Sequence, residues 1–425
     1  MSGKTVFRGE LSVPGDKSIS HRAAMFAALA TGVSRVRGFL HAEDTLSTAG
    51  MMRALGARIE EVSPTELRIE GKGLRALVEP SDVIDAGNSG TTIRIGSGIL
   101  AAQPFLSVLT GDRTLRRRPM GRVIEPLVKM GASIRGRDGN RLPPLCIRGG
   151  SLRGIRYEMP VASAQVKSSL LLAGLYADSP VTVVEPLLSR DHTERMLKAM
   201  GAIVSREGNA VTVAPCERLD PLDVTVPGDI SSAAFFLVLA AVTPGSSLTV
   251  RGVGVNPFRT GVVEVLRRMG AGIRYSSERV VGGEPVADLV VCGAELAPAD
   301  VAPEEVPGLI DEVPALCVAA VFAAGRTKIR GAGELRVKES DRIAAMVACL
   351  SSLGIPCGEY PDGLWVEGPA AVRPGISCDS RGDHRIAMSL RVLGAAAGVP
   401  IEVKNVECID TSFPGFQSLL DGLTR

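Results

Sequence analysis

The stretch GDKSISHR, residues 15–22, leads into a run of small apolar residues and is the first of six similar openings in the chain. The other five openings are GNSGTTIR from Gly87, ASAQVKSS from Ala162, GDISSAAF from Gly228, IDEVPALC from Ile310 and GDHRIAMS from Gly382. The six openings start 72, 75, 66, 82 and 72 residues apart. A polar or charged turn before an apolar run predicts the N-terminus of a buried helix. Such an end carries unpaired N–H groups and a partial positive charge, so it is suited to binding an anion.

A second series of helices runs in step with the first. Five amphipathic segments each end in a glycine before a strand-like stretch, and these glycines are Gly56, Gly131, Gly201, Gly270 and Gly354. The glycines are 75, 70, 69 and 84 residues apart, so the longest interval falls in the same place in both series. Both series therefore belong to one repeated unit, which reads as strand, buried helix, strand, amphipathic helix and further strands.

Six repeats in a chain of 425 residues indicate two lobes of three repeats, because one hydrophobic core rarely serves so long a chain. The natural break lies near the strand-like segment Asp223–Val226. We therefore predict an α/β protein with one lobe at residues 14–226 and a second lobe made of residues 1–13 and 227–425. We expect the first strand, Thr5–Val13, to pair with the second lobe and so form a two-stranded hinge.

The composition argues against several classes of protein. A net charge of +2 and an aromatic content of 4% offer no basic stacking surface for nucleic acid. The four histidines are dispersed and the eight cysteines include no CxxC pair, so we expect neither a metal site nor a disulfide framework. The longest apolar runs, such as Ala233–Val242, are shorter than the ~20 residues that span a bilayer. No signal-peptide pattern opens the sequence, so we expect a cytoplasmic protein with free thiols and no membrane insertion.

The first opening gathers groups that bind phosphate or carboxylate. Lys17 and His21 are four residues apart, as are Ser18 and Arg22, so each pair shares one face of the predicted helix. The alternative is an ordinary helix cap with solvated charges. The GxxxxGK[ST] frame of a nucleotide-binding loop is missing.

Further cations lie beside the predicted helix starts and turns, with only a few carboxylates among them. The cations are Lys17, Arg22, Arg118, Arg190, Lys338, Arg342 and Arg385, and the carboxylates are Asp311 and Glu339. Such an excess of positive charge repels itself unless a polyanionic ligand occupies it. The carboxylates are then available for proton transfer, although an acid such as Asp311 at a helix start is more often a cap.

The ordered set of motifs GDKS, GNSGTT, RPM, SAQ, VKESDR and DHR closely resembles the EPSP synthase family over nearly the whole chain. The resemblance implies two similar lobes, each of three βαβαββ units, arranged as an inside-out α/β barrel that closes on its ligands. It places the active site in the cleft between the lobes. SAQVK together with RDHTE is similar to a bacterial subgroup that is often less sensitive to glyphosate.

The resemblance implies a transferase of the shikimate pathway, in chorismate and aromatic amino-acid biosynthesis. Its reaction would move the enolpyruvyl group of phosphoenolpyruvate to the 5-hydroxyl of shikimate 3-phosphate, with release of phosphate. The implied mechanism is addition followed by elimination through a tetrahedral intermediate. The resemblance implies a monomer that needs no metal and no organic cofactor, and whose partners are these two small molecules.

The resemblance also assigns roles to individual residues. Asp311 would be the base for the 5-hydroxyl, Glu339 the acid toward the methylene carbon, and Lys17 would share in proton transfer. The residues that would hold phosphoenolpyruvate are Lys17, Gly90, Arg118, Gln165, Arg342 and Arg385. The residues that would hold shikimate 3-phosphate are Lys17, Ser18, Arg22, Ser163, Ala164, Gln165, Arg190, Asp311 and Lys338.

Three positions depart from the pattern of many relatives. Thr411 stands where they carry a Lys, so that cation is either missing or supplied by Lys404. Glu334 stands in place of an Asn and His192 in place of a Tyr. These departures concern local contacts and leave the expected reaction unchanged.

Two other functions remain open at this point. The first is a sister enolpyruvyl transferase acting on a UDP-amino sugar, which usually needs a loop cysteine; the segment Leu109–Arg122 has none. The second is a non-catalytic anion-binding protein, which would have little reason to keep Asp311 and Glu339 among its cations. Gly90 leaves room beside the predicted phosphoenolpyruvate site, so we also expect some inhibition by glyphosate.

Overall fold

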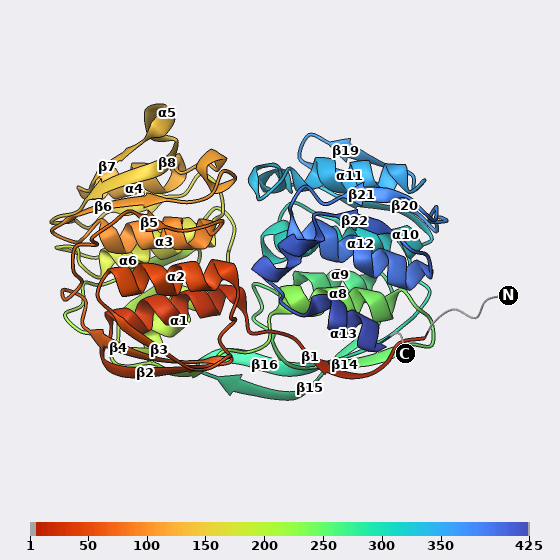
Figure 1. The fold of residues 1–425 in the computed structure, drawn as a ribbon, viewed down its shortest axis with the longest axis horizontal. Coiled ribbons are helices and arrows are strands. Elements are labelled where there is room, and N and C mark those ends of the chain that lie inside the picture. Colours follow the sequence, from red (N-terminus) through yellow and green to blue (C-terminus); the bar gives the residue numbers. More distant parts are fainter. Residues whose placement is uncertain (1–5, 424–425) are drawn as a thin grey trace. The chain divides into compact units, whose positions relative to one another are not determined.

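The computed structural model describes residues 6–423, and the chain divides into two compact units (Figure 1). The N-terminal unit comprises Gly15–Val226 together with the short segment Val281–Glu284. The C-terminal unit comprises the described residues up to Pro14, Pro227–Val280 and the chain from Pro285 onward. Each unit contains three repeats, and each repeat forms its own small sheet.

The N-terminal unit holds three four-stranded sheets. The elements of its first repeat are α1 (Lys17–Leu29), β2 (Thr31–Arg37), α2 (Glu43–Ala54), β3 (Arg58–Ser63), β4 (Glu66–Lys72) and β13 (Asp223–Thr225). Those of the second are β5 (Ile84–Asp85), α3 (Gly90–Leu100), β6 (Leu106–Thr110), η1 (Leu115–Arg117), α4 (Gly121–Met130), β7 (Ser133–Gly136), α5 (Arg137–Asn140) and β8 (Leu142–Arg148). Those of the third are β9 (Arg156–Glu158), α6 (Ala164–Gly174), β10 (Val181–Val184), α7 (His192–Ala199), β11 (Val204–Glu207) and β12 (Ala210–Val213).

The C-terminal unit repeats this order with a shorter last sheet. Its first repeat contains β1 (Arg8–Ser12), α8 (Ile230–Ala241), β14 (Ser247–Gly254), α9 (Gly261–Arg268), β15 (Gly272–Val281) and β16 (Glu284–Cys292). Its second contains β17 (Asp300–Val301), η2 (Val306–Gly308), η3 (Ile310–Glu312), α10 (Val313–Phe322), β18 (Gly325–Ile329), η4 (Gly333–Val337), α11 (Arg342–Ser352), β19 (Cys357–Tyr360) and β20 (Gly363–Gly368). Its third contains β21 (Ser377–Asp379), α12 (His384–Ala397), β22 (Glu402–Lys404), η5 (Val406–Thr411) and α13 (Phe416–Leu423).

The sheets share one topology. In each four-stranded sheet the leading strand pairs in parallel with the next strand of the sheet, and that strand pairs antiparallel with its other neighbour, as in β5–β6–β8–β7. The sixth repeat keeps only the parallel pair β21–β22 and continues into η5 and α13 in place of a hairpin. The α/β fold class predicted from the repeats is confirmed, with the last repeat shortened.

Two leading strands are exchanged between the units. β1 precedes α1 in the chain but pairs in parallel with β14, from Arg8 opposite Ser247 to Ser12 opposite Arg251. β13 precedes α8 but pairs in parallel with β2 of the N-terminal unit. Of the predicted first strand Thr5–Val13, Thr5 lies outside the described residues and Arg8–Ser12 forms β1. The chain therefore passes between the units twice next to an exchanged strand.

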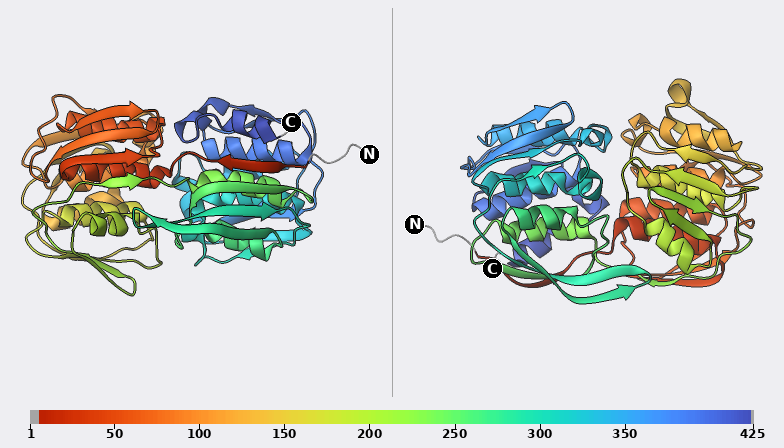
Figure 2. Two further views of the ribbon diagram at one scale, coloured as in Figure 1. Left: turned by 90° about the horizontal axis from the view of Figure 1, so that it is seen from below. Right: turned by 180° about the vertical axis from the view of Figure 1, so that it is seen from behind.

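The first helix of each repeat lies in the core, and the sheets cover the outer faces of these buried helices in each unit (Figure 2). Helices α3 and α6 pack so closely that a Cβ on Gly98 would lie 2.1 Å from the carbonyl oxygen of Ser169. The second helices are amphipathic, and α4 ends at Gly131 in the left-handed conformation, with φ of 115°. All five predicted terminal glycines have positive φ, which confirms the second helix series.

His21 is a buried histidine of the first repeat that makes the stability of the fold depend on pH. Its side chain on α1 is fully buried, and Nδ1 lies 2.7 Å from Oγ1 of Thr48. Burial, and then the charges of Lys17 and Arg22, hold the pKa of His21 well below its ordinary value of 6.5. Below about pH 6.5 the unfolded chain therefore binds a proton that the folded chain does not, which destabilises the fold.

We expect the free energy of unfolding to fall with decreasing pH below about 6.5, by up to about 1.4 kcal/mol per pH unit from this one group. Denaturant unfolding of the wild type and of His21→Asn between pH 7.5 and 5 measures this pH dependence of the free energy of unfolding. The wild type should lose more stability than the variant over this range. Parallel pH profiles for the two proteins would show that His21 does not stay neutral in the fold.

Candidate active site

The helix starts of the N-terminal unit are held by side-chain caps. Asp16 Oδ1 accepts a hydrogen bond from the Ile19 amide at 2.8 Å, and Ser89 Oγ accepts one from the Thr92 amide at 3.1 Å. Ser163 Oγ accepts from the Val166 amide at 3.4 Å, so this predicted ligand residue also caps α6, whose first residue is Ala164. The three predicted openings of this unit are helix N-termini, as expected.

Arg22 and Arg190 converge on Ser18 at the start of α1. Arg22 is 2% exposed; it donates to Oγ1 of Thr193 and to Oγ of Ser168, each at 2.7 Å, and to the Ser18 carbonyl at 2.9 Å. Arg190 Nη1 donates to Ser18 Oγ at 3.1 Å. Burial, and then the charge of Arg190, lowers the pKa of Arg22 to about 10, so it stays charged at neutral pH. Two cations are thus brought to Ser18, Arg190 at its hydroxyl and Arg22 at its carbonyl, and this positive charge suits a phosphate group.

Lys17, the residue before Ser18, forms an ion pair of 3.0 Å with Asp44 on α2. Neither Asp44 nor the supporting hydroxyl of Thr193 was singled out as a site residue from the sequence. The i, i+4 spacing explains why Arg22 Nη1 returns to the carbonyl of Ser18. Lys17 is therefore fixed by a carboxylate that follows it by 27 residues.

A second group forms where α3 and α6 begin. Gln165 Oε1 accepts from Arg94 Nη1 at 2.8 Å, and Gln165 Nε2 donates to Thr91 Oγ1 at 3.0 Å. Arg118, 7% exposed, donates to the Asn88 carbonyl at 3.3 Å. A Cβ on Gly90 would lie 2.8 Å from Arg94 Nη1 and 3.0 Å from Arg118 Cζ. The predicted residues Gly90, Arg118 and Gln165 therefore meet at one helix start, together with Arg94.

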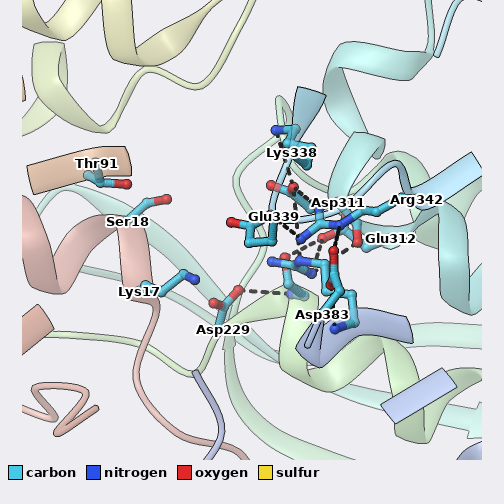
Figure 3. Close-up of polar contacts among 12 residues, drawn as sticks. Lys17, Ser18, Thr91, Asp229, Asp311, Glu312, Lys338, Glu339, Arg342 and Asp383 are labelled. Carbon is cyan, nitrogen blue, oxygen red and sulfur yellow. Dashed lines mark hydrogen bonds and ion pairs between the residues drawn. The ribbon is translucent and has the colours of Figure 1, made fainter. Parts of the chain in front are cut away.

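In the C-terminal unit, Arg342 is surrounded by three carboxylates (Figure 3). Arg342 is 1% exposed; it donates to Glu339 Oε2 at 2.6 Å, to Asp383 Oδ2 at 2.8 Å and to Asp311 Oδ1 at 3.2 Å. Burial opposes its charge, but Asp383, Glu339 and Asp311 together raise the pKa of Arg342 above its ordinary value. Arg342 is therefore a permanent cation that holds both predicted proton-transfer carboxylates, Asp311 and Glu339.

Two further cations approach Asp311. Lys338 Nζ lies 3.6 Å and Arg385 Nε 3.9 Å from Asp311 Oδ1, and Arg385 Nη1 donates to the Asp311 carbonyl at 3.0 Å. The structure thus brings together Asp311, Lys338, Glu339, Arg342 and Arg385, which lie up to 74 residues apart. Three cationic side chains, those of Lys338, Arg342 and Arg385, thus lie within 4 Å of one oxygen of the Asp311 carboxyl group.

Four further charged residues of this cluster were not assigned a role from the sequence. They are Asp229, Arg259, Glu312 and Asp383. Asp383 and Asp229 are helix caps, which accept from the Arg385 amide at 3.0 Å and the Ser231 amide at 2.8 Å. The sequence pattern of a helix cap at Asp229 and at Asp383 could have identified these two residues. Arg259 lies in a loop before α9, and nothing in its local sequence predicts its contact with Asp229.

The structure shows where His192, Thr411 and Lys404 lie, the residues named in connection with departures from the family pattern. His192, at the start of α7, is buried and its Nδ1 lies 2.8 Å from Glu284 Oε1. Thr411 lies in η5 and donates to the Cys408 carbonyl at 2.7 Å. Lys404 ends β22 and is exposed to solvent.

Within residues 6–423, no three His, Cys, Asp or Glu side chains gather as metal ligands would. Over the same residues, no helix has the length and apolar character needed to cross a membrane. All eight cysteines are free.

The fold is that of the enolpyruvyl transferases. The crystal structure of the enolpyruvyl transferase NikO from Streptomyces tendae matches 99% of this chain and 95% of its own with a TM-score of 0.79, at 18% identity. EPSP synthase from Acinetobacter baumannii matches 99% of this chain and 96% of its own with a TM-score of 0.88, at 45% identity.

Sequence comparison defines the family within this fold. The model of EPSP synthase (3-phosphoshikimate 1-carboxyvinyltransferase) matches residues 1–420. The 3-phosphoshikimate 1-carboxyvinyltransferase of Desulforudis audaxviator is 55% identical over 98% of this chain and 97% of its own length. The 3-phosphoshikimate 1-carboxyvinyltransferase of Geobacter sulfurreducens is 55% identical over 97% of this chain and 96% of its own length. The chain therefore belongs to the EPSP synthase family.

Proposed function

We propose that this chain transfers the enolpyruvyl group of phosphoenolpyruvate to the 5-hydroxyl of shikimate 3-phosphate, giving 5-enolpyruvylshikimate 3-phosphate and phosphate. It is a transferase of aromatic amino-acid biosynthesis. The observation that carries the proposal at the level of residues is the cluster around Arg342. There, Asp311 and Glu339 are held among cations, as acid–base chemistry on anionic substrates requires.

The cations offset the charge of the substrates. Phosphoenolpyruvate would be held by Lys17, Arg118, Arg342 and Arg385, with Gly90 and Gln165 beside it. The hydrogen bonds that join Arg94 and Thr91 through Gln165 support this assignment, because they order the start of α3 next to Gly90. A charge-assisted hydrogen bond from each guanidinium is stronger and more directional than one from a neutral donor.

Shikimate 3-phosphate would be held by a second set of residues. They are Lys17, Ser18, Arg22, Ser163, Ala164, Gln165, Arg190, Asp311 and Lys338. The meeting of Arg22 and Arg190 at Ser18 supports the phosphate end of this assignment. Arg22 uses its guanidinium nitrogens on Ser18, Ser168 and Thr193, so its part is to position Ser18 and add charge.

Proton transfer would involve two carboxyl groups in turn. Asp311 takes the proton of the 5-hydroxyl as its oxygen bonds to the central carbon of phosphoenolpyruvate. Glu339 gives a proton to the methylene carbon, with Lys17 sharing in the transfer, and a tetrahedral intermediate forms. Loss of a proton from the new methyl group and of phosphate from the central carbon then restores the double bond.

The active site would lie in the cleft between the units, with the cationic helix starts of one and the acids of the other serving the same two substrates. Because shikimate 3-phosphate would bind residues of both, we expect it to draw the units together. X-ray scattering in solution should then give a smaller radius of gyration with this ligand than without it. Equal radii at saturating ligand would count against a shared site.

The working form of the protein would be a cytoplasmic monomer without nucleic-acid or membrane partners. Scarce aromatic residues and a net charge of +2 argue against a nucleic-acid partner. Membership of the subgroup with reduced glyphosate sensitivity stays a prediction from SAQVK and RDHTE, and inhibition constants for glyphosate measure it.

The proposed reaction is tested by phosphate release. Purified protein should release phosphate from phosphoenolpyruvate when shikimate 3-phosphate is added, and should not do so with UDP-N-acetylglucosamine. Release with the UDP-sugar alone would assign the chain to the sister reaction. Binding of shikimate 3-phosphate without any release would favour an anion-binding protein.

A further inference from the structure

Glu312 follows the predicted base Asp311, yet its side chain serves a different set of partners. It is 1% exposed and stands at the start of α10. Its Oε1 accepts a hydrogen bond from Ser231 Oγ and lies 3.8 Å from Arg259 Nη2. Its Oε2 is buried and has no hydrogen-bond partner within residues 6–423. Arg259 therefore lies beside Glu312, whereas Lys338 and Arg342 lie beside Asp311.

The partners of Glu312 belong to the start of another buried helix. Arg259 Nη2 donates to Ser231 Oγ at 2.7 Å and lies 3.3 Å from Asp229 Oδ1. Asp229 caps α8 by accepting from the Ser231 amide at 2.8 Å. Figure 3 shows Asp229 and Glu312 in the same cluster as Asp311. The chain of contacts Asp229–Arg259–Ser231–Glu312 thus joins the N-termini of α8 and α10.

Arg385 lies between the two consecutive acids. Its Nη1 is 4.0 Å from Glu312 Oε1, while its Nε is 3.9 Å from Asp311 Oδ1 and Nη1 donates to the Asp311 carbonyl at 3.0 Å. Its own amide is tied to Asp383, the cap of α12. The guanidinium is therefore attracted from two sides, and its direction depends on both carboxyl groups.

We propose that Glu312 is a positioning residue, which with Ser231 and Arg259 sets the direction of the Arg385 guanidinium next to Asp311. This inference rests on the proposed function, in which Arg385 holds phosphoenolpyruvate. Without the charge of Glu312, Arg385 is attracted by Asp311 alone and turns away from its substrate. Glu312 itself touches no substrate, and its effect passes through Arg385.

The test uses Glu312→Gln, which keeps the size of the side chain and removes its charge. We expect kcat/KM for phosphoenolpyruvate to fall about 10- to 100-fold, because small displacements of a substrate-holding group have effects of this size. The KM for shikimate 3-phosphate should stay within about twofold, because Arg385 is not among its predicted ligands. A matched control is Glu305→Gln, whose carboxylate pairs with Arg268 outside the cluster and should leave both KM values unchanged.

Crystal structures of the wild type and Glu312→Gln give a readout that does not depend on turnover. We expect the guanidinium of Arg385 to move away from residue 312 and toward the Asp311 carboxylate in the variant. The inference is overturned if Arg385 keeps its place, or if the two KM values change equally. If Glu312→Gln does not fold, Ser231→Ala is tested in its place. We expect the same fall in kcat/KM for phosphoenolpyruvate and the same nearly constant KM for shikimate 3-phosphate. An unchanged kcat/KM for phosphoenolpyruvate would overturn the inference. A wild type without turnover would refute the proposed function, whereas the position of Arg385 would still decide this inference.

Discussion

Glu339→Gln is expected to reduce turnover about 100- to 10,000-fold, the usual contribution of a well-placed general acid or base. The amide is isosteric with the carboxyl group but has no proton to give to the methylene carbon. Its oxygen can still accept the hydrogen bond that Arg342 Nη2 now donates to Glu339 Oε2 at 2.6 Å. Binding of both substrates should therefore change little.

Single-turnover kinetics and equilibrium binding of shikimate 3-phosphate separate these two effects. Glu367→Gln is a matched control, because Glu367 on β20 forms an exposed ion pair with Arg326 and should tolerate the change. Near-normal turnover of Glu339→Gln would remove this residue from the mechanism. Lost binding with a normal rate of chemistry would assign it a structural role.

Arg342→Ala is expected to have the largest effect on stability. The change leaves Asp311, Glu339 and Asp383 close together without the cation that now contacts all three. Breaking a buried ion pair by removing one partner typically costs about 3–5 kcal/mol. Turnover should fall as well, because Arg342 is a predicted ligand of phosphoenolpyruvate and orients both proton-transfer groups.

Urea unfolding followed together with turnover measures this prediction. Lys328→Ala is the control, because Lys328 and Asp300 form a largely exposed pair in the same unit, where such pairs contribute at most about 1 kcal/mol. Arg342→Lys should recover only part of the loss, since an ammonium cannot reproduce three directed guanidinium contacts. A fully stable Arg342→Ala would show that the three carboxylates do not depend on this cation.

The repeat and the helix starts could be predicted from the sequence because they depend on local chemistry. A polar turn before a buried helix, and a glycine after an amphipathic one, leave a pattern within about ten residues. Gly56 and Gly131 show this, since both have the positive φ that a left-handed helix end requires. The shortened sixth repeat was not foreseen, because η5 and α13 occupy the place of a hairpin.

The site could be predicted only where its residues lie in ordered motifs. Asp311, Lys338, Glu339, Arg342 and Arg385 were singled out in this way, and the structure brings them into contact. Contact partners that lie far apart in the sequence were not predicted. Arg259 joins Asp229 from 30 residues away within one repeat, and Ser231 joins Glu312 from 81 residues away because two repeats place their helix starts side by side.

The most direct test of the central claim follows the carbon atoms of the donor. Purified protein is incubated with shikimate 3-phosphate and phosphoenolpyruvate labelled with ¹³C in its vinyl carbons, and the mixture is observed by ¹³C and ³¹P NMR. The predicted result is a shift of the vinyl signals from the phosphate ester to an ether on the acceptor, with one phosphate released per ether formed. Unchanged phosphoenolpyruvate, or its hydrolysis to pyruvate without the ether, would contradict the assignment.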